Sequence, residues 1–243
     1  MFRISKNVEK DLNIYNLELF DRNKSCYAKI YLNQGASLQE LTLSGHVLIK
    51  DMNTLTYDNT YTSAILFPFA NRIKDGSYEF DKKTYQLDIN EKGLNNAIHG
   101  LVYNKTFEVI DQEATETYAS VKLVYHENHL SQGFPFTYTI HLEYVLTESA
   151  LDLNVKISNT DSKTFPFTLG WHPYFLSSNL YESYIDFSSD KKIVFDERNI
   201  TTGVNDFEKN GNFEILDKFL DDCFVLNSKE ILFNTPKYNL ELS

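Results

Sequence analysis

Apolar and polar residues alternate with a period of two along much of the chain. In the segment 151–157, Leu151, Leu153 and Val155 share one face, while Asp152 and Asn154 share the other. This alternation is typical of a strand that buries one face and exposes the other. The same pattern predicts strands in the segments 27–32, 121–125 and 138–146.

Turn signals separate these alternating runs. The segments 76–80 and 84–87 flank the polar turn Asp81-Lys-Lys, which predicts a β-hairpin. The polar segment 197–222 has few strand signals and predicts a long loop or irregular segment. Further strands are expected at 45–50, 106–110, 192–196 and 231–234.

Many short strands predict an all-β fold, either a sandwich or a barrel, and their alternation favours antiparallel sheets. The sequence shows no sustained helical periodicity with end caps, and no linker rich in proline, glycine or serine divides it. A length of 243 residues suits one large β domain. We therefore expect a single domain over residues 1–243.

Charge and cysteine content exclude several classes of function. The formal net charge is -11 and no basic stripe is visible, so nucleic acid is not an expected partner. Arginine is limited to Arg3, Arg22, Arg72 and Arg198, which disfavours a phosphate-binding pocket. Two cysteines far apart in the sequence make neither a disulfide framework nor a zinc site, so no metal is expected.

The N-terminal segment is charged, and no apolar run approaches the roughly 20 residues that span a bilayer. We therefore expect a soluble, cytoplasmic protein without a membrane partner. The sequence contains neither the glycine-rich loops of nucleotide-binding proteins nor the Gly-x-Ser-x-Gly elbow of serine hydrolases. No cofactor is therefore expected, and both a monomer and a dimer are compatible with the sequence.

Four short segments combine polar side chains with turns or strand ends. In the first, Phe67-Pro-Phe-Ala-Asn-Arg-Ile73, Asn71 and Arg72 follow an aromatic run. The Arg72 guanidinium can grip two adjacent hydroxyls, although an arginine that satisfies loop carbonyls explains the segment equally well. The second, Asn95-Asn-Ala-Ile-His-Gly100, places His99 before a glycine that allows close backbone approach to a ligand. These residues alone favour a structural histidine that caps a turn.

The third segment, Phe165-Pro-Phe-Thr-Leu-Gly-Trp-His-Pro-Tyr-Phe175, contains the single tryptophan, a histidine and two prolines. Pro173 favours an extended backbone at His172, and Trp171 and Tyr174 offer flat faces on which a sugar can stack. This coincidence favours a functional histidine over a packed core corner.

The fourth segment, Phe219-Leu-Asp-Asp-Cys-Phe224, contains two adjacent carboxylates. On a strand, Asp221 and Asp222 would face opposite sides, so they make a poor catalytic pair. One of them could accept hydrogen bonds from sugar hydroxyls, and a solvated turn is the alternative.

Taken in order, these segments resemble the aldose 1-epimerase (mutarotase) family. The similarity covers most of the chain and runs through Gly35-Ala-Ser-Leu, residues 65–80, Ile98-His-Gly100, Gly133-Phe-Pro-Phe136, Gly170-Trp-His-Pro-Tyr-Phe175 and Leu220-Asp-Asp-Cys-Phe224. It implies the family's large antiparallel β-sandwich. It also implies an isomerase of carbohydrate metabolism that interconverts the α and β anomers of a neutral free hexose, such as glucose or galactose, without metal or cofactor.

The resemblance implies roles for individual residues. Arg72 and Asp221 would bind sugar hydroxyls, and Asn71 and Trp171 would complete the substrate-binding set. His99 would bind near the ring oxygen and assist proton transfer. His172 would be the general acid that protonates the ring oxygen.

The family's general base is a glutamate in a Glu-Pro-like motif near the C-terminus. This chain ends at Tyr238-Asn-Leu-Glu-Leu-Ser243, a stretch that resembles the strand before that motif. Neither Glu241 nor Glu230 matches the glutamate of the family. We therefore expect a C-terminally truncated sandwich, from a truncated gene or a fragment, that binds sugar but turns it over poorly.

Three alternatives compete with this interpretation. A non-catalytic carbohydrate-binding relative is favoured by the missing base. A hexose-6-phosphate 1-epimerase shares the fold, but the scarcity of arginine counts against it. A glycoside hydrolase would need two carboxylates about 5–9.5 Å apart, and the sequence offers no convincing pair.

Overall fold

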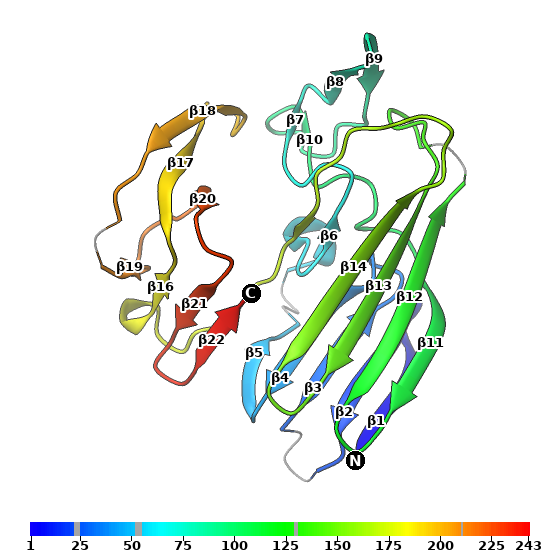
Figure 1. The fold of residues 1–243 in the computed structure, drawn as a ribbon, viewed down its shortest axis with the longest axis vertical. Helices are drawn as coiled ribbons and strands as arrows, with labels where there is room; N and C mark the ends of the chain where they lie inside the picture. The colour runs from blue at the N-terminus through cyan, green and yellow to red at the C-terminus, as the bar shows by residue number, and fades with distance from the viewer. Residues whose placement is uncertain (22–24, 52–54, 129–130, 210) are drawn as a thin grey trace. The chain divides into compact units, whose positions relative to one another are not determined.

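The computed structural model describes residues 1–21, 25–51, 55–128, 131–209 and 211–243, which form strands joined by turns and loops (Figure 1). Arg22 lies outside the described residues. The chain divides into two compact units, Met1–Phe175 and Leu176–Ser243, and each is described by itself. The expectation of a single domain over residues 1–243 stays a prediction.

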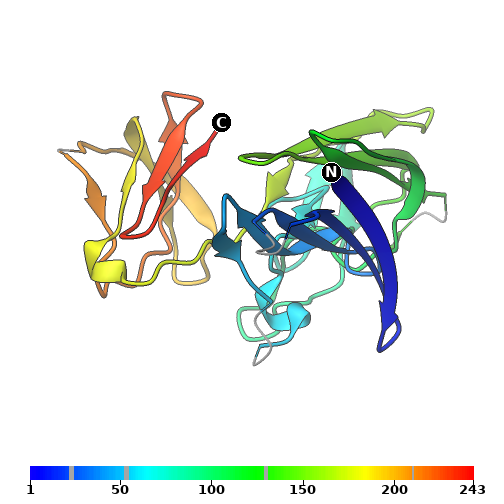
Figure 2. The ribbon, with the colours of Figure 1, turned by 90° about the horizontal axis from the view of Figure 1, so that it is seen from below.

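Two antiparallel sheets form the layers of the first unit, and Figure 2 shows one layer over the other. One sheet follows the sequence order β1 (Phe2–Glu9), β2 (Leu12–Leu19), β3 (Tyr27–Tyr31), β4 (Ser37–Leu43) and β5 (His46–Ile49). The other follows the order β11 (Glu108–Ala114), β12 (Ala119–Glu127), β13 (Tyr138–Leu146) and β14 (Leu151–Asn159). Both sheets are meanders, because each strand pairs with the next along the chain.

Short two-stranded ladders lie outside these two sheets. They pair β6 (Ile65–Leu66) with β15 (Gly170–Trp171), β7 (Ile73–Lys74) with β10 (Asn96–Ala97), and β8 (Ser77–Phe80) with β9 (Lys83–Gln86). The β8–β9 hairpin confirms the prediction made from its polar turn. One turn of helix, α1 (Tyr57–Thr60), precedes β6.

The core lies between the two layers. On β13 the side chains at alternate positions are almost completely buried, with exposures of 0–1% for Tyr138, Ile140, Leu142, Tyr144 and Leu146. Burying a large apolar side chain contributes roughly 1.5–3 kcal/mol, so this one face holds much of the stability of the unit. The two layers are also joined by a hydrogen bond of 2.9 Å that the phenol of Tyr144 donates to the carbonyl of Ala36.

The second unit contains two smaller sheets. One has the order β19 (Phe213–Glu214), β16 (Tyr184–Asp186), β21 (Ile231–Asn234) and β22 (Asn239–Leu242), and the other has the order β18 (Thr201–Asp206), β17 (Ser189–Phe195) and β20 (Phe224–Leu226). A short 3-10 helix, η1 (Leu180–Glu182), precedes β16. Phe213 and Phe224, one from each sheet, lie with ring centroids 5.5 Å apart, so aromatic side chains pack the two sheets together.

The predicted all-β sandwich is confirmed, and so are the strands expected from alternation in β3, β12, β13 and β14. The prediction for the segment 197–222 is wrong in part, because this segment contains β18 and β19. Within the part of the chain that the structure describes, no helix has the length and apolar character that a membrane span requires.

Candidate functional site

The β6–β15 ladder fixes the backbone of His172. Leu66 pairs with Gly170, and Ile65 pairs with Trp171. The ladder continues beyond the strands, since the His172 amide donates to the Ala64 carbonyl at 3.1 Å. Its carbonyl accepts from the Ser63 amide at 2.7 Å. The Trp-His dipeptide is therefore attached to the strand that leads into the Asn-Arg segment.

A close backbone contact fixes the residue after His99. Gly100 pairs with Phe67 in a parallel bridge, and the Leu101 amide donates to the Phe67 carbonyl at 2.7 Å. Gly100 has φ of 73°, and a Cβ atom at this position would lie 2.2 Å from the Phe67 oxygen. Only glycine fits such an approach without a shift of the backbone. The His-Gly pair is therefore a local requirement of the fold.

The side chain of Asn90 fixes the residue before His99. Its Oδ1 accepts from the Ile98 amide at 2.7 Å, and its Nδ2 donates to the Ile98 carbonyl at 2.9 Å. His99 itself has φ of 66°, in the left-handed region that few residues other than glycine adopt. Strained backbone of this kind persists where the surroundings hold it, and it is frequent at functional sites.

These constraints bring two distant histidines together. The rings of His99 and His172 lie with centroids 4.9 Å apart and planes at 63°. Tyr61 meets His99 edge-on at 4.8 Å, and Tyr174 lies 5.2 Å from His172. Two of the predicted site residues are thus neighbours in a row of aromatic rings.

His99 is held in its neutral form. Burial is the largest cause that lowers its pKa to about 4, followed by the proximity of His172. A hydrogen bond with the Ala70 backbone acts in the opposite direction. The Nδ1 atom of His99 is buried and has no hydrogen-bond partner among the described residues. A neutral imidazole with an unpaired nitrogen retains an unused hydrogen-bond acceptor.

Arg72 makes an ion pair that the sequence did not predict. Its Nε lies 3.0 and 2.9 Å from the two carboxylate oxygens of Glu91, and its Nη2 lies 2.9 Å from Oε1. Asn96 donates to the same carboxylate at 2.9 Å. Burial alone would raise the pKa of Glu91, but the hydrogen bonds from Arg72 and Asn96 hold it below its ordinary value.

The ion pair leaves Arg72 able to bind a ligand. Two-pronged contact with Glu91 fixes the guanidinium plane and occupies only part of its five donors. Positive charge on Arg72 is also among the causes that lower the pKa of His99, so the two side chains are close enough to interact electrostatically. Asn71 bonds the amide of Arg72 through its own side chain at 2.8 Å, and it is otherwise exposed.

The remaining predicted residues have different surroundings. The indole of Trp171 is half-buried and donates to the Ser63 carbonyl at 3.2 Å. Asp221 belongs to the second unit, where it is exposed and precedes β20. Its neighbour Asp222 pairs with Lys192 at 2.5 Å. The roles of Trp171 and Asp221 in sugar binding stay predictions.

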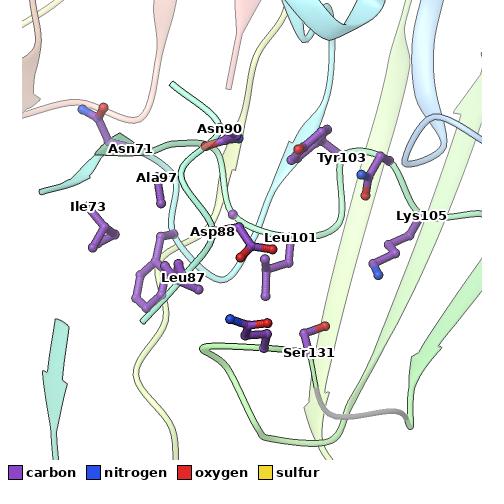
Figure 3. Close-up of a pocket in the computed structure, with 14 residues that line it drawn as sticks. Asn71, Ile73, Leu87, Asp88, Asn90, Ala97, Leu101, Tyr103, Lys105 and Ser131 are labelled. Atoms are coloured by element: carbon purple, nitrogen blue, oxygen red, sulfur yellow. The ribbon is translucent and has the colours of Figure 1, made fainter. Parts of the chain in front are cut away.

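A pocket of about 340 Å³ is lined in part by the sequence neighbours of His99 and Arg72, and we call it the lateral pocket. Figure 3 shows the side chains that line it. Gly100 and Asn71, the neighbours of His99 and Arg72, are part of its wall, but the rings of the two histidines are not. It is lined by Phe69, Asn71, Ile73, Leu87, Asp88, Asn90, Ala97, Gly100, Leu101, Tyr103, Asn104, Lys105, Ser131 and Gln132.

Metal ligands were not expected from the sequence. Among the residues described by the structure, no three or more His, Cys, Asp or Glu side chains form a group that could hold a metal ion.

Comparison with known proteins identifies the family of this fold. The family model for aldose 1-epimerase matches residues 19–243. A maltose epimerase from Levilactobacillus brevis is 30% identical over 186 residues, which cover 71% of this chain and 54% of that protein. A galactose mutarotase from Bos taurus is 28% identical over 148 residues, which cover 59% of this chain and 42% of that protein. The chain thus spans about half the length of these curated relatives.

Solved structures agree on the fold. A galactose mutarotase-like protein from Clostridium acetobutylicum superposes with a TM-score of 0.82 at 21% identity, covering 97% of this chain and 78% of that protein. A galactose 1-epimerase from Lactobacillus acidophilus superposes with a TM-score of 0.77 at 18% identity, covering 97% of this chain and 77% of that protein. At these identities the similarity establishes the architecture.

Proposed function

Because the chain belongs to the aldose 1-epimerase family, we propose that it binds a neutral free hexose and interconverts the α and β anomers by acid–base ring opening. The observation that carries this proposal is the pair of histidine rings 4.9 Å apart beside the Arg72–Glu91 ion pair. Two histidines and a fixed guanidinium supply both a proton donor and hydroxyl-binding groups within one small region.

The proposed reaction needs one acid and one base. His172 protonates the ring oxygen while a base removes the proton of the anomeric hydroxyl, so the bond between C1 and the ring oxygen breaks and an aldehyde forms. Rotation about the C1–C2 bond and reclosure on the other face give the second anomer, and both protons return. Each proton-transfer partner typically contributes about 10²–10⁴-fold to the rate.

His99 is suited to a supporting role in this scheme. Since its pKa lies at about 4, it is neutral near pH 7 and does not compete with His172 for the transferred proton. Its Nδ1 is buried and has no partner among the described residues, so a sugar hydroxyl could bond to it only after a shift of the surrounding side chains. Arg72 can donate to further hydroxyls from the plane that Glu91 fixes.

Among the described residues of the site, no side chain is well suited to act as the base. Glu91 is the carboxylate bound to Arg72, but its lowered pKa makes it a weak proton acceptor near pH 7. This observation favours a second candidate function, in which residues 1–243 bind sugar and turn it over slowly or not at all. Both candidates predict binding, and they differ in turnover.

Polarimetry separates the two candidates. Fresh α-glucose and α-galactose are followed with and without the chain, and binding of the same sugars is measured by calorimetric titration. Acceleration above the spontaneous rate supports the isomerase, and binding without acceleration supports the binding protein. Absence of both would overturn the proposal. Glucose 6-phosphate in a parallel assay tests the phosphate-specific alternative, and we expect it to be the poorer substrate.

A further inference from the structure

Asn96 is a completely buried amide in β10, with an exposed fraction of 0%. Its Nδ2 donates to Oε2 of Glu91 at 2.9 Å. The same oxygen lies 2.9 Å from Nε of Arg72. We propose that Asn96 is a positioning residue, which sets the affinity for sugar through Glu91 and Arg72. This inference rests on the proposed function, because binding of a free hexose is its readout.

Two backbone hydrogen bonds hold Asn96 against Glu91. The Glu91 amide donates to the Asn96 carbonyl at 3.0 Å, and the Asn96 amide donates to the Glu91 carbonyl at 3.2 Å. In the β7–β10 ladder, Asn96 is also paired with Lys74, and Ala97 is paired with Ile73. Figure 3 shows Ile73 and Ala97 near each other on these two strands. The amide of Asn96 therefore reaches the carboxylate from a backbone that is fixed on two sides.

Glu91 contacts one edge of the Arg72 guanidinium. Nε lies 3.0 Å from Oε1 and 2.9 Å from Oε2, and Nη2 lies 2.9 Å from Oε1. Among the described residues, Nη1 of Arg72 makes no hydrogen bond or ion pair. The Arg72 side chain is 17% exposed, so solvent still reaches it. The N–H groups of Nη1 are therefore left for a ligand, and their direction depends on the position of the carboxylate.

Asn96 limits the ways in which Glu91 and Arg72 can pair. A carboxylate can meet a guanidinium in more than one arrangement, and a rotation of the Glu91 carboxylate would move the guanidinium with it. Because Oε2 also accepts the hydrogen bond from Asn96, the carboxylate has a second anchor apart from Arg72. Side chains that are held in place before a ligand arrives lose less entropy when it binds. A buried amide thus acts on sugar binding through two other side chains.

The groups near this contact leave a usable window between pH 5 and pH 7. Although burial acts in the opposite direction, hydrogen bonds hold the pKa of Glu91 below its ordinary value, so Glu91 stays ionised. Burial lowers the pKa of His99 to about 4, so His99 stays neutral. Burial raises the pKa of Tyr61, so its phenol stays protonated. The positive side chains are Arg72 and, across the β7–β10 ladder, the exposed Lys74. A carboxyl group placed at position 96 would therefore titrate against a nearly constant background.

Asn96→Asp tests the inference, because it keeps the shape of the side chain and replaces the donor by an acceptor. Two carboxylates would then share one guanidinium, and their repulsion raises the pKa of one of them. At pH 7 we expect calorimetric titration with glucose and galactose to show binding about tenfold weaker than that of the original chain. At pH 5 a protonated carboxyl group donates to Glu91 as the amide did, so the difference from the original chain at the same pH should largely disappear.

Asn95→Asp is the matched control, since the Asn95 amide also donates to a carboxylate, that of Asp75 at 2.7 Å. It adds the same charge one position away and should leave the sugar affinity unchanged at both pH values. Asn96→Ala introduces no charge and should weaken binding about tenfold at both pH values. In a Glu91→Ala background, Asn96→Ala should have little further effect, because the connection to Arg72 is already broken.

The outcomes separate this inference from the proposed function. If the original chain binds sugar and Asn96→Asp binds equally well at pH 7, or if its loss persists at pH 5, the positioning role is refuted and the hexose function stands. An undiminished effect of Asn96→Ala in the Glu91→Ala background would also refute it. If the original chain binds neither sugar, both proposals fail.

Thermal melting checks the fold of each variant. If Asn96→Asp does not fold, Asn96→Ala and the Glu91→Ala background decide the question without it. Failure of both Asn96 variants to fold would make Asn96 a purely structural residue and overturn the positioning role.

Discussion

The imidazole rings of His99 and His172 lie 4.9 Å apart, although the two residues reach this position from separate loops. At this distance, a positive charge on one ring disfavours protonation of the other, and His172 is among the causes of the lowered pKa of His99. The pair therefore holds one proton more easily than two. This asymmetry supports the proposed division between a proton donor and a neutral hydrogen-bonding partner.

Removal of the proposed acid should abolish turnover. We expect His172→Ala to lower any polarimetric rate by about 10²–10⁴-fold while the thermal melting curve shows an intact fold. His141→Ala, a partly exposed histidine on β13 of the same unit, is the matched control and should leave the rate unchanged. Full activity of the His172 variant would eliminate the acid assignment.

The burial of His99 makes the stability of the chain depend on pH. The ordinary pKa of 6.5 falls to about 4 in the folded state, so between these values the unfolded chain binds a proton that the folded chain does not. The contribution of His99 is therefore fully present above about pH 6.5 and is lost as the pH falls towards 4.

Urea denaturation between pH 7 and pH 4 measures this effect. The free energy of unfolding should fall more steeply for the original chain than for His99→Gln, whose amide does not titrate. Identical slopes for the two proteins would show that His99 is not the group responsible.

The effects of substitutions at Arg72 and at Glu91 on the free energy of unfolding should be strongly coupled. Hydrogen bonds to charged groups contribute about 1.5–3 kcal/mol, so Arg72→Ala should destabilise the fold by about that amount, because it removes the positively charged partner of a partly buried carboxylate. The double variant Arg72→Ala/Glu91→Gln should recover part of the loss. Additive effects in the denaturation measurements would contradict the coupling. Titration with glucose should also show weaker binding for Arg72→Ala.

The close packing around Gly100 should affect the stability of the fold more than the positive φ of this residue alone. Gly100→Ala and Gly45→Ala both place a side chain at positive φ, 73° and 78°, but only the first brings a Cβ atom within 2.2 Å of a backbone oxygen. We expect Gly45→Ala to cost about 1–2 kcal/mol and Gly100→Ala to cost more and to weaken sugar binding by displacing His99. Equal losses of stability, measured by denaturation, would refute the packing argument.

Alternation predicted several strands that bury one face. It missed two mostly exposed edge strands, and it also missed β2, in which the consecutive residues 14–17 are all buried. The central strand β13 was visible in the sequence because alternate side chains are buried against the opposite sheet. β1 and β18 lie at sheet edges and are mostly exposed, so they carry no clear alternation. Edge strands form through backbone pairing with one neighbouring strand. The order of apolar and polar side chains does not reveal this pairing when neither face is buried.

Motifs drew attention to three residues that the structure places near one another, and no motif drew attention to Glu91. His99, His172 and Arg72 stood out beside glycine, proline and aromatic residues. Glu91 lies in the polar stretch Asn-Glu-Lys-Gly, and it reaches Arg72 because its backbone pairs with Asn96 next to the β7–β10 ladder. No local pattern encodes that pairing. Arg72 and Glu91 are 19 positions apart in the sequence. Many oppositely charged pairs share such a separation, so it does not identify these two residues as partners.

The amide side chain of Asn90 has two neighbours of different kinds. It holds both backbone groups of Ile98, and it forms part of the wall of the lateral pocket. A guest molecule that competes for this amide would loosen the peptide immediately before His99. A substitution of this one amino acid would therefore change the shape of the pocket and the support of the His99 backbone at the same time.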